Sequence, residues 1–167
     1  MKIKTPEKTT KAILDIVDRS HTLAKEKVGE SKRFDYLRNT FIKLLKKEGF
    51  RDFDNGGFKQ LFQHDSYPEI LVKVYYRSKD HTIDTCMPKL PSFLRKHFVI
   101  PIKTNHLYIL QPLVNCKRGR WRSSAAKALY KLLKDPHLID LAGDLDITCD
   151  NVLFHDGKPA IIDFCRV

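Results

Sequence analysis

The hydrophobic period of this chain changes at Gly49, and that change restricts the fold more than any other feature of the sequence. Before it, apolar residues recur at helical spacing from Thr9 to Lys27 and again from Ser31 to Glu48. Gly49 stands where a glycine commonly ends a helix. After it, residues 50 to 65 follow a strand pattern around a Gly-rich turn. The sequence therefore predicts an α+β fold in which two helices precede a small antiparallel sheet.

The rest of the chain adds further strands and helices. One strand is predicted from Glu69 to Tyr76, after a break at Tyr67-Pro68, and another from His106 to Val114. A short helical segment is predicted within residues 80 to 101, and a longer helix from Ser123 to Asp135.

Composition limits the classes of protein and partner. The chain has 167 residues, enough for one compact domain or two small lobes. Lys and Arg outnumber Asp and Glu by 31 to 20, so an anionic partner is expected: a nucleotide, a nucleic acid or an acidic protein face. The four cysteines form no CxxC pair, which argues against a zinc site and a disulfide framework. With no apolar run of the roughly 18 residues that a membrane span needs, and no signal-peptide core, we expect a cytoplasmic protein without a membrane partner.

The stretch GDLDITCDNVLFHDGKPAIIDF, Gly143 to Phe164, carries acids and an amide at regular intervals. Two short apolar strands flank a turn at residues 155 to 158, so the sequence predicts a hairpin. A hairpin brings Asn151 and Asp163 to the same end, where amide and carboxylate oxygens can share a hard cation such as Mg²⁺. Asp146, with four residues between it and Asn151, would stand beside them as a base.

Two upstream features could hold an anion. The turn Asn55-Gly56-Gly57-Phe58 lies between two predicted strands, and its missing side chains let backbone N–H groups approach a phosphate. Alone, Asn-Gly between strands is more often an ordinary hairpin turn. Lys73 lies in the middle of an apolar strand, with its side chain directed opposite to those of its neighbours. It lies either on a solvated face or in a cleft with an anionic partner.

Taken in order, these parts resemble the catalytic and metal-binding segments of the protein kinase superfamily, and the Gly-Asp-Leu, Asn-Val-Leu-Phe and Ile-Asp-Phe runs are similar to those of aminoglycoside and other small-molecule kinases. The resemblance covers Phe50 to Phe164 and is nearest to compact bacterial and phage kinase-like proteins. It implies a protein kinase-like fold with a helical leader at 1–49, an antiparallel-sheet N-lobe at 50–114 and a minimal C-lobe at 115–167 that ends at the metal-binding hairpin.

The resemblance also implies a role for each candidate residue. Asp146 matches the catalytic-loop Asp, and Asn151 and Asp163 match the metal ligands. Lys73 matches the lysine that positions ATP. The turn that covers the nucleotide is matched by Asn55, Gly56, Gly57 and Phe58. The hinge that faces adenine is matched by the segment Gln111 to Val114, which includes Leu113. The implied cofactors are ATP and Mg²⁺, and the implied activity is phosphoryl transfer, more in keeping with a protein Ser or Thr acceptor than with a small molecule.

The sequence departs from the family at the acid that pairs with the strand lysine. Protein kinases place a helical Glu beside that lysine, but no Glu follows Glu69 in this chain. The alternatives are Asp80, Asp84 and Glu48.

Other departures concern the base and the end of the chain. Asp144-Leu145-Asp146 stands in place of His-Arg-Asp, which leaves Asp144 as an alternative base, and Cys165 replaces the Gly of the metal-binding motif. The sequence ends at Val167, before any activation segment. Two interpretations stay open: a minimal active kinase-like unit, and a catalytically silent pseudokinase that binds a protein or regulates one.

Two hypotheses lie outside the family. The basic loop at residues 117–122, with one Trp among Lys and Arg, is typical of a patch that binds nucleic acid, although such a loop is more often simply solvated. A nucleic-acid role predicts binding that weakens steeply with salt. The plainest alternative is an α+β domain whose acids cap turns.

Overall fold

The computed structural model describes residues 1–29, 33–55, 59–77, 92–114, 124, 127–129, 131 and 151–162. The chain divides into two compact units. The sheet unit comprises Lys4–His81 and Pro101–Leu113, and the hairpin unit comprises Met1–Ile3, Thr82–Ile100 and Val114–Val167. None of the helices described is long and apolar enough to cross a membrane.

Two helices begin the sheet unit, as predicted. Helix α1 spans Glu7–Val28 and helix α2 spans Phe34–Lys47. Acidic residues in their first turns and lysines in their last turns suit the helix dipole. Gly49 follows the end of α2 with a φ of 93°, a conformation that residues with a Cβ rarely adopt, so the predicted stop is confirmed.

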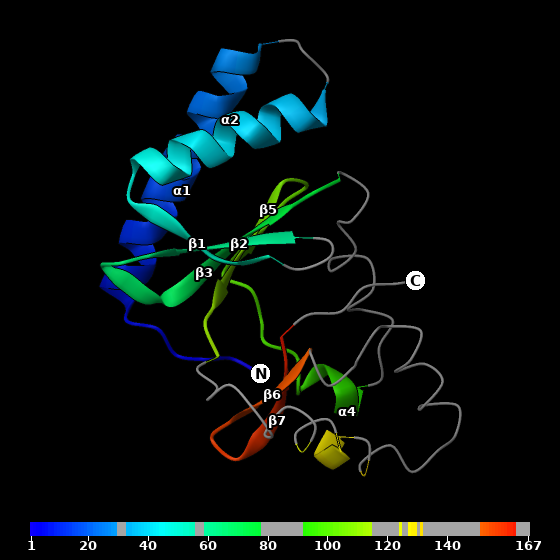
Figure 1. Cartoon of the computed structure of the whole chain (residues 1–167). Helices are drawn as coiled ribbons and strands as arrows, with labels where there is room; N and C mark the ends of the chain where they lie inside the picture. The colour runs from blue at the N-terminus through cyan, green and yellow to red at the C-terminus, as the bar shows by residue number, and fades with distance from the viewer. Residues whose placement is uncertain are drawn as a thin grey trace. The chain divides into compact units, whose positions relative to one another are not determined.

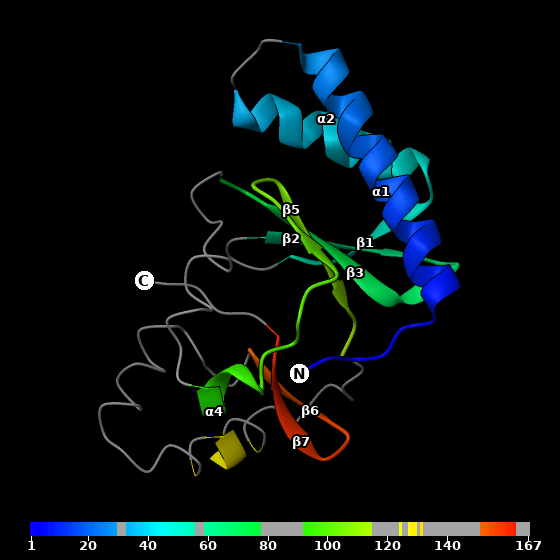
Figure 2. The ribbon, with the colours of Figure 1, turned by 180° about the vertical axis from the view of Figure 1, so that it is seen from behind.

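A five-stranded antiparallel sheet follows, which confirms the predicted α+β class. Its strands are β1 (Phe50–Asn55), β2 (Lys59–His64), β3 (Tyr67–Tyr75), β4 (Lys103–Thr104) and β5 (Tyr108–Pro112), in the order β1-β2-β3-β5-β4. Figure 1 and the reverse view in Figure 2 show α1 and α2 on the same side of this sheet.

The strand boundaries differ from prediction in two places. Tyr67 and Pro68 are not a break but the first residues of β3, where a missing N–H is tolerated. The chain instead turns at Asp65-Ser66, beside a register shift between Gln63 and His64. Strand β4 was not predicted, because two residues are too few to show any alternation.

Strand β1 contains one extra residue relative to β2. Asp52 pairs with Phe62 and Asp54 pairs with Leu61, so the ladder passes over Phe53. Directly paired residues share a face of the sheet, so this β-bulge assigns Asp52 and Asp54 to opposite faces. Asp52 lies toward the helices, where it accepts a hydrogen bond of 2.6 Å from a lysine of α2.

The sheet buries an apolar face under the helices. Ile70, Val72 and Val74, alternate residues of β3, belong to the main buried cluster. The other fully or almost fully buried members are Ile13, Val17, Ala24, Phe41, Leu45, Phe50, Phe62, Leu107, Tyr108 and Leu110. The intervening β3 residues Leu71, Lys73 and Tyr75 therefore face the opposite side, and they too are buried.

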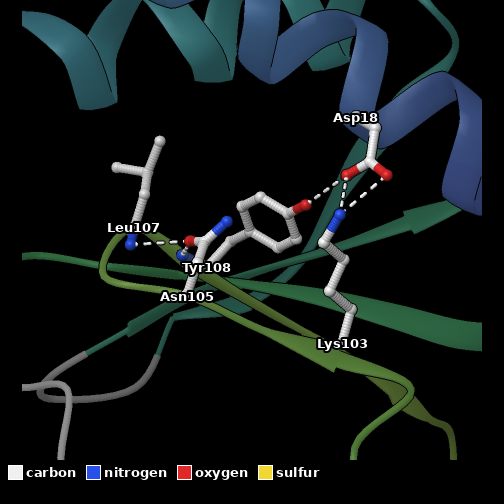
Figure 3. Close-up of polar contacts among 5 residues, drawn as sticks. All are labelled: Asp18, Lys103, Asn105, Leu107 and Tyr108. Atoms are coloured by element: carbon white, nitrogen blue, oxygen red, sulfur yellow. Dashed lines mark hydrogen bonds and ion pairs between the residues drawn. The ribbon is translucent and has the colours of Figure 1, made fainter.

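A polar cluster fastens α1 to the sheet (Figure 3). The Asp18 carboxylate accepts hydrogen bonds from Lys103 Nζ at 2.7 and 2.8 Å and from Tyr108 Oη at 2.7 Å. Next to it, the Asn105 side-chain oxygen accepts the backbone N–H groups of Leu107 and Tyr108, which shapes the turn into β5. Residues far apart in the sequence thereby join one helix to two strands.

The hairpin unit contains α4 (Ser92–Arg95), β6 (Val152–His155) and β7 (Lys158–Ile161). β6 and β7 pair antiparallel, so the hairpin predicted from the sequence is confirmed. Its turn has positive φ at both central residues, Asp156 (49°) and Gly157 (71°), as a type I′ turn requires.

Residues 97 to 99 extend this hairpin on its other side. Phe98 forms a parallel bridge with Ile161, whose N–H donates to the His97 carbonyl at 2.8 Å. The Met1 amino group in turn donates to the Phe98 carbonyl.

Candidate functional site

The face of the sheet opposite the helices holds the strand lysine identified from the sequence. Lys73 lies two residues before the end of β3 and is only 3% exposed. Its neighbours Val72 and Val74 belong to the helix-side cluster, which confirms that its side chain points the other way. The alternative of a solvated face is excluded, because lysines are almost never buried to this degree without compensating interactions.

Two further buried polar side chains share this face. In the strand register, Lys73 pairs with Leu61 of β2, and Gln111 of β5 pairs with the residue two positions before Lys73. Lys59 of β2 pairs with Tyr75, two positions after Lys73. Gln111 is 3% exposed and Lys59 is 4% exposed.

These three residues form a line that we call the diagonal stripe: Gln111 on β5, Lys73 on β3 and Lys59 on β2. The three strands are neighbours, and each step along the stripe moves one strand across and two residues along. Such diagonal neighbours lie about 7–8 Å apart, within reach of long side chains. The stripe leads from the segment expected to face adenine toward the turn expected to cover the phosphates.

Lys59 was missed in the sequence, although it directly follows the predicted turn. Its ammonium lies 5.4 Å from the centre of the Tyr75 ring, a cation–π contact that partly offsets burial of the charge. Lys59 and Leu61 lie on one face of β2, and Leu61 is paired with Lys73, so the fold places Lys59 on the face of Lys73. The pattern of β2 alone gave no reason to expect a buried lysine.

The Gly turn connects β1 to β2, as predicted. Asn55 is the last residue of β1 and Lys59 the first of β2, so the connection consists of residues 56 to 58. Gly56, Gly57 and Phe58 lie outside the described residues.

Leu113, at the proposed adenine-facing segment, has its amide engaged within the sheet unit. Its N–H donates to the Glu69 carbonyl at 2.7 Å, which continues the β3–β5 pairing beyond Pro112. A ligand that meets Leu113 would therefore contact its half-buried side chain rather than its amide hydrogen.

Of the proposed metal ligands and base, the described part of the chain contains Asn151 alone. Its carbonyl accepts the Ile162 N–H at 2.9 Å, so the hairpin brings Asn151 beside the residue that precedes Asp163. This contact joins backbone groups, and the role of Asn151 and Asp163 as Mg²⁺ ligands stays a prediction. Asp146 and Asp163 lie outside the described residues, among which no group of three His, Cys, Asp or Glu side chains gathers as a metal site would require.

Of the three acids suggested in place of the helical Glu, the described residues include Glu48. Glu48 forms an ion pair of 2.8 Å with Arg19 of α1, so it pairs there and not with Lys73. Asp80, Asp84, Asp144 and the basic loop at 117–122 lie outside the described residues.

A buried histidine supports the hairpin from its outer side. His97 is 7% exposed, and its Nδ1 contacts the Pro159 carbonyl at 2.8 Å. Because a carbonyl only accepts, Nδ1 carries the hydrogen, and Nε2 is left with no hydrogen-bond partner in the described part of the protein. His97 therefore fixes the start of β7, the strand that leads toward Asp163.

The sequence matches no protein-family model, and no curated protein shows significant similarity to it.

Proposed function

We propose that this protein is an ATP- and Mg²⁺-dependent phosphotransferase of the protein kinase-like fold, which acts on a protein Ser or Thr hydroxyl. One observation carries the proposal: Lys73, 3% exposed, lies on the third strand of an antiparallel sheet whose first two strands are joined by the Gly turn. In protein kinases the lysine that contacts the phosphates is on the third strand, and a Gly-rich loop covers them.

The sheet unit supplies the nucleotide-binding groups. Lys73 binds the α- and β-phosphates, and the amides of Gly56 and Gly57 approach them from the turn. Gln111 and the side chain of Leu113 contact the base, in keeping with the engagement of the Leu113 amide by Glu69.

The hairpin unit supplies the groups for the transfer. Asn151 and Asp163 would hold Mg²⁺, which neutralises phosphate charge when it is bound. The Asp146 carboxylate orients the acceptor hydroxyl and receives its proton. The hydroxyl oxygen forms a bond to the γ-phosphorus while the bond from that phosphorus to the β-phosphate oxygen breaks, and ADP leaves.

Calorimetric titration of Mg·ATP into the whole chain tests the proposal. We expect saturable binding that requires Mg²⁺ and is lost in Lys73→Ala and Asp163→Ala. Lys43→Ala and Asp15→Ala, which remove exposed charges from the helices, are the matched controls and should bind as the wild type does. If the wild type does not bind at millimolar nucleotide, the proposed phosphotransferase activity is refuted.

Transfer is measured separately, with γ-labelled ATP and a mixture of peptides that contain Ser and Thr. If labelling of the peptides is lost in Asp146→Asn, Asp146 is the base. If labelling is lost in Asp144→Asn instead, Asp144 has that role. Binding without transfer identifies the catalytically silent alternative, a kinase-like module that binds a protein.

A further inference from the structure

We infer that His97 is a positioning residue for the Mg²⁺ site: it holds β7 at the edge opposite β6 and thereby fixes the end of the strand that Asp163 follows. The inference rests on the proposed function, since it concerns the metal ligands proposed there. His97 has no place among the roles that the kinase resemblance assigned.

The first step is that β7 gains a partner on its second edge. A two-stranded hairpin is only marginally stable by itself, and β6 pairs with one edge of β7. Residues 97 to 99 pair with the other edge. The Ile161 N–H donates to the His97 carbonyl at 2.8 Å, and the Ile161 carbonyl accepts the Val99 N–H at 2.9 Å. Ile161 therefore directs both of its backbone groups away from β6.

The second step is that the His97 side chain continues this pairing where the backbone does not. Strand residues two apart direct their backbone groups to the same edge, so the Pro159 carbonyl points away from β6 as that of Ile161 does. The chain before His97 belongs to the helical turn of α4, and the His97 N–H donates to the Leu94 carbonyl at 2.9 Å. The imidazole Nδ1–H donates to the Pro159 carbonyl instead, at 2.8 Å.

The third step is that this contact is buried. His97 is 7% exposed, and Pro159 is buried as well. In the part of the chain that the structure describes, Nε2 has no hydrogen-bond partner, so the polar contact of the ring there is the one with Pro159. Without the imidazole, a buried carbonyl would lose its donor, which favours states in which β7 moves away from this edge.

The fourth step connects this edge to the proposed metal ligands. Ile161 is held at the outer edge of β7, and the next residue, Ile162, donates its N–H to the Asn151 carbonyl at 2.9 Å on the β6 side. Two consecutive residues are thus held from opposite edges, directly before Asp163 in the sequence. Ligands on an ordered backbone bind a cation more tightly, because binding then costs less conformational entropy. Loss of the contact at Pro159 should therefore weaken Mg²⁺ binding.

Calorimetric titration of Mg·ATP into whole-chain variants tests the inference. In His97→Leu we expect an affinity at least about fivefold weaker than in the wild type. His97→Asn places an amide N–H at the position of Nδ1 and should stay within about twofold of the wild type, whereas the amide of His97→Gln lies one bond further and should not restore binding. His155→Asn changes a histidine at the turn end of the same hairpin and should bind as the wild type does.

The wild type gives a second test, because coupling between two sites is reciprocal. If the contacts of residues 97 to 99 favour Mg²⁺ binding, then bound Mg·ATP must favour those contacts. Binding of Mg·ATP should therefore slow hydrogen exchange at the Ile161 and Val99 amides, which donate across this edge.

The outcomes separate the inference from the proposed function. If His97→Leu binds as the wild type does, or if His97→Asn binds no better than His97→Leu, the role of His97 is overturned while the nucleotide site stands. A role in packing alone would make Asn, the smallest of the three replacements, the weakest binder. Unchanged exchange at both amides overturns the inference even if no variant folds. A wild type that does not bind Mg·ATP refutes the proposed function and the inference with it.

Discussion

The contact between Asp18 and the sheet gives a stability prediction with a definite magnitude. The buried Tyr108 hydroxyl donates to the Asp18 carboxylate at 2.7 Å, and Lys103 donates to the same group. Burial raises the pKa of the Asp18 carboxyl, but the hydrogen bonds from Lys103 and Tyr108 outweigh burial and hold it below its usual value. The charged carboxylate is thus the form that stabilises the fold.

The two contacts differ in strength. The Asp18 and Lys103 side chains are 38% and 40% exposed, so solvent screens the ion pair to about 0.5 kcal/mol. A hydrogen bond from a buried hydroxyl to a charged group contributes about 1.5 kcal/mol, at the low end of its range because the carboxylate is partly solvated. Asp18→Ala should therefore lower the free energy of unfolding by about 2 kcal/mol, and Lys103→Met by about 0.5 kcal/mol.

A double-mutant cycle measured by urea denaturation checks this reasoning. Tyr108→Phe alone should cost about 1 kcal/mol, because it removes the hydroxyl but leaves the carboxylate with Lys103 and water. Combined with Asp18→Ala it should add almost nothing, since the hydroxyl has already lost its acceptor. Additive losses, or equal losses for Asp18→Ala and Lys103→Met, would contradict the picture, provided that the denaturant slope is unchanged.

Two further predictions concern the helical layer. Burial, assisted by nearby lysine and histidine charges, lowers the pKa of His21 from 6.5 to about 4. Between these two pH values the unfolded chain binds a proton that the folded protein does not. The free energy of unfolding should therefore fall as the pH is lowered from 6.5 to 4, by up to about 1.4 kcal/mol per pH unit. In His21→Leu the urea midpoint should change less with pH across this range than in the wild type. An unchanged dependence on pH would show that His21 is not the group responsible. Gly49→Ala should cost about 1–3 kcal/mol, because φ is 93° and the new Cβ would lie 3.1 Å from His64 Nε2. In thermal unfolding, Gly49→Ala should lower the stability less in a His64→Ala background than in the wild type. Equal losses of stability in the two backgrounds would show that the contact with His64 contributes nothing.

The parts of the fold that the sequence could predict are those with a long, regular pattern. Both helices, the Gly49 stop, the β1–β2–β3 order and the β6–β7 hairpin each rest on local residues. Strand β4 and the Asp18 cluster could not be predicted in this way. Strand β4 has only two residues, too few to show alternation. The Asp18 cluster depends on contacts between residues 85 and 90 positions apart in the sequence, which no local window contains.

The candidate site, like the fold, could be predicted from the sequence only in part. Alternation in β3 sufficed to direct Lys73 away from its valine neighbours, but alternation does not say whether that face is solvated. The burial of Lys73 and Lys59 became visible only in the fold, because it depends on what covers the face. The diagonal stripe required the pairing of three strands, and register is a property of the folded sheet rather than of any one segment.

The bulge at Phe53 makes the effect of a one-residue deletion in β1 depend on which residue is lost. Because the ladder already passes over Phe53, removing it would restore regular alternation and leave Asp52 paired with Phe62 and Asp54 paired with Leu61. Asp52 would keep its lysine on α2, and Asp54 would stay on the side that carries the diagonal stripe. Removing Asp52 instead would place Phe53 opposite Phe62 and abolish the hydrogen bond to α2.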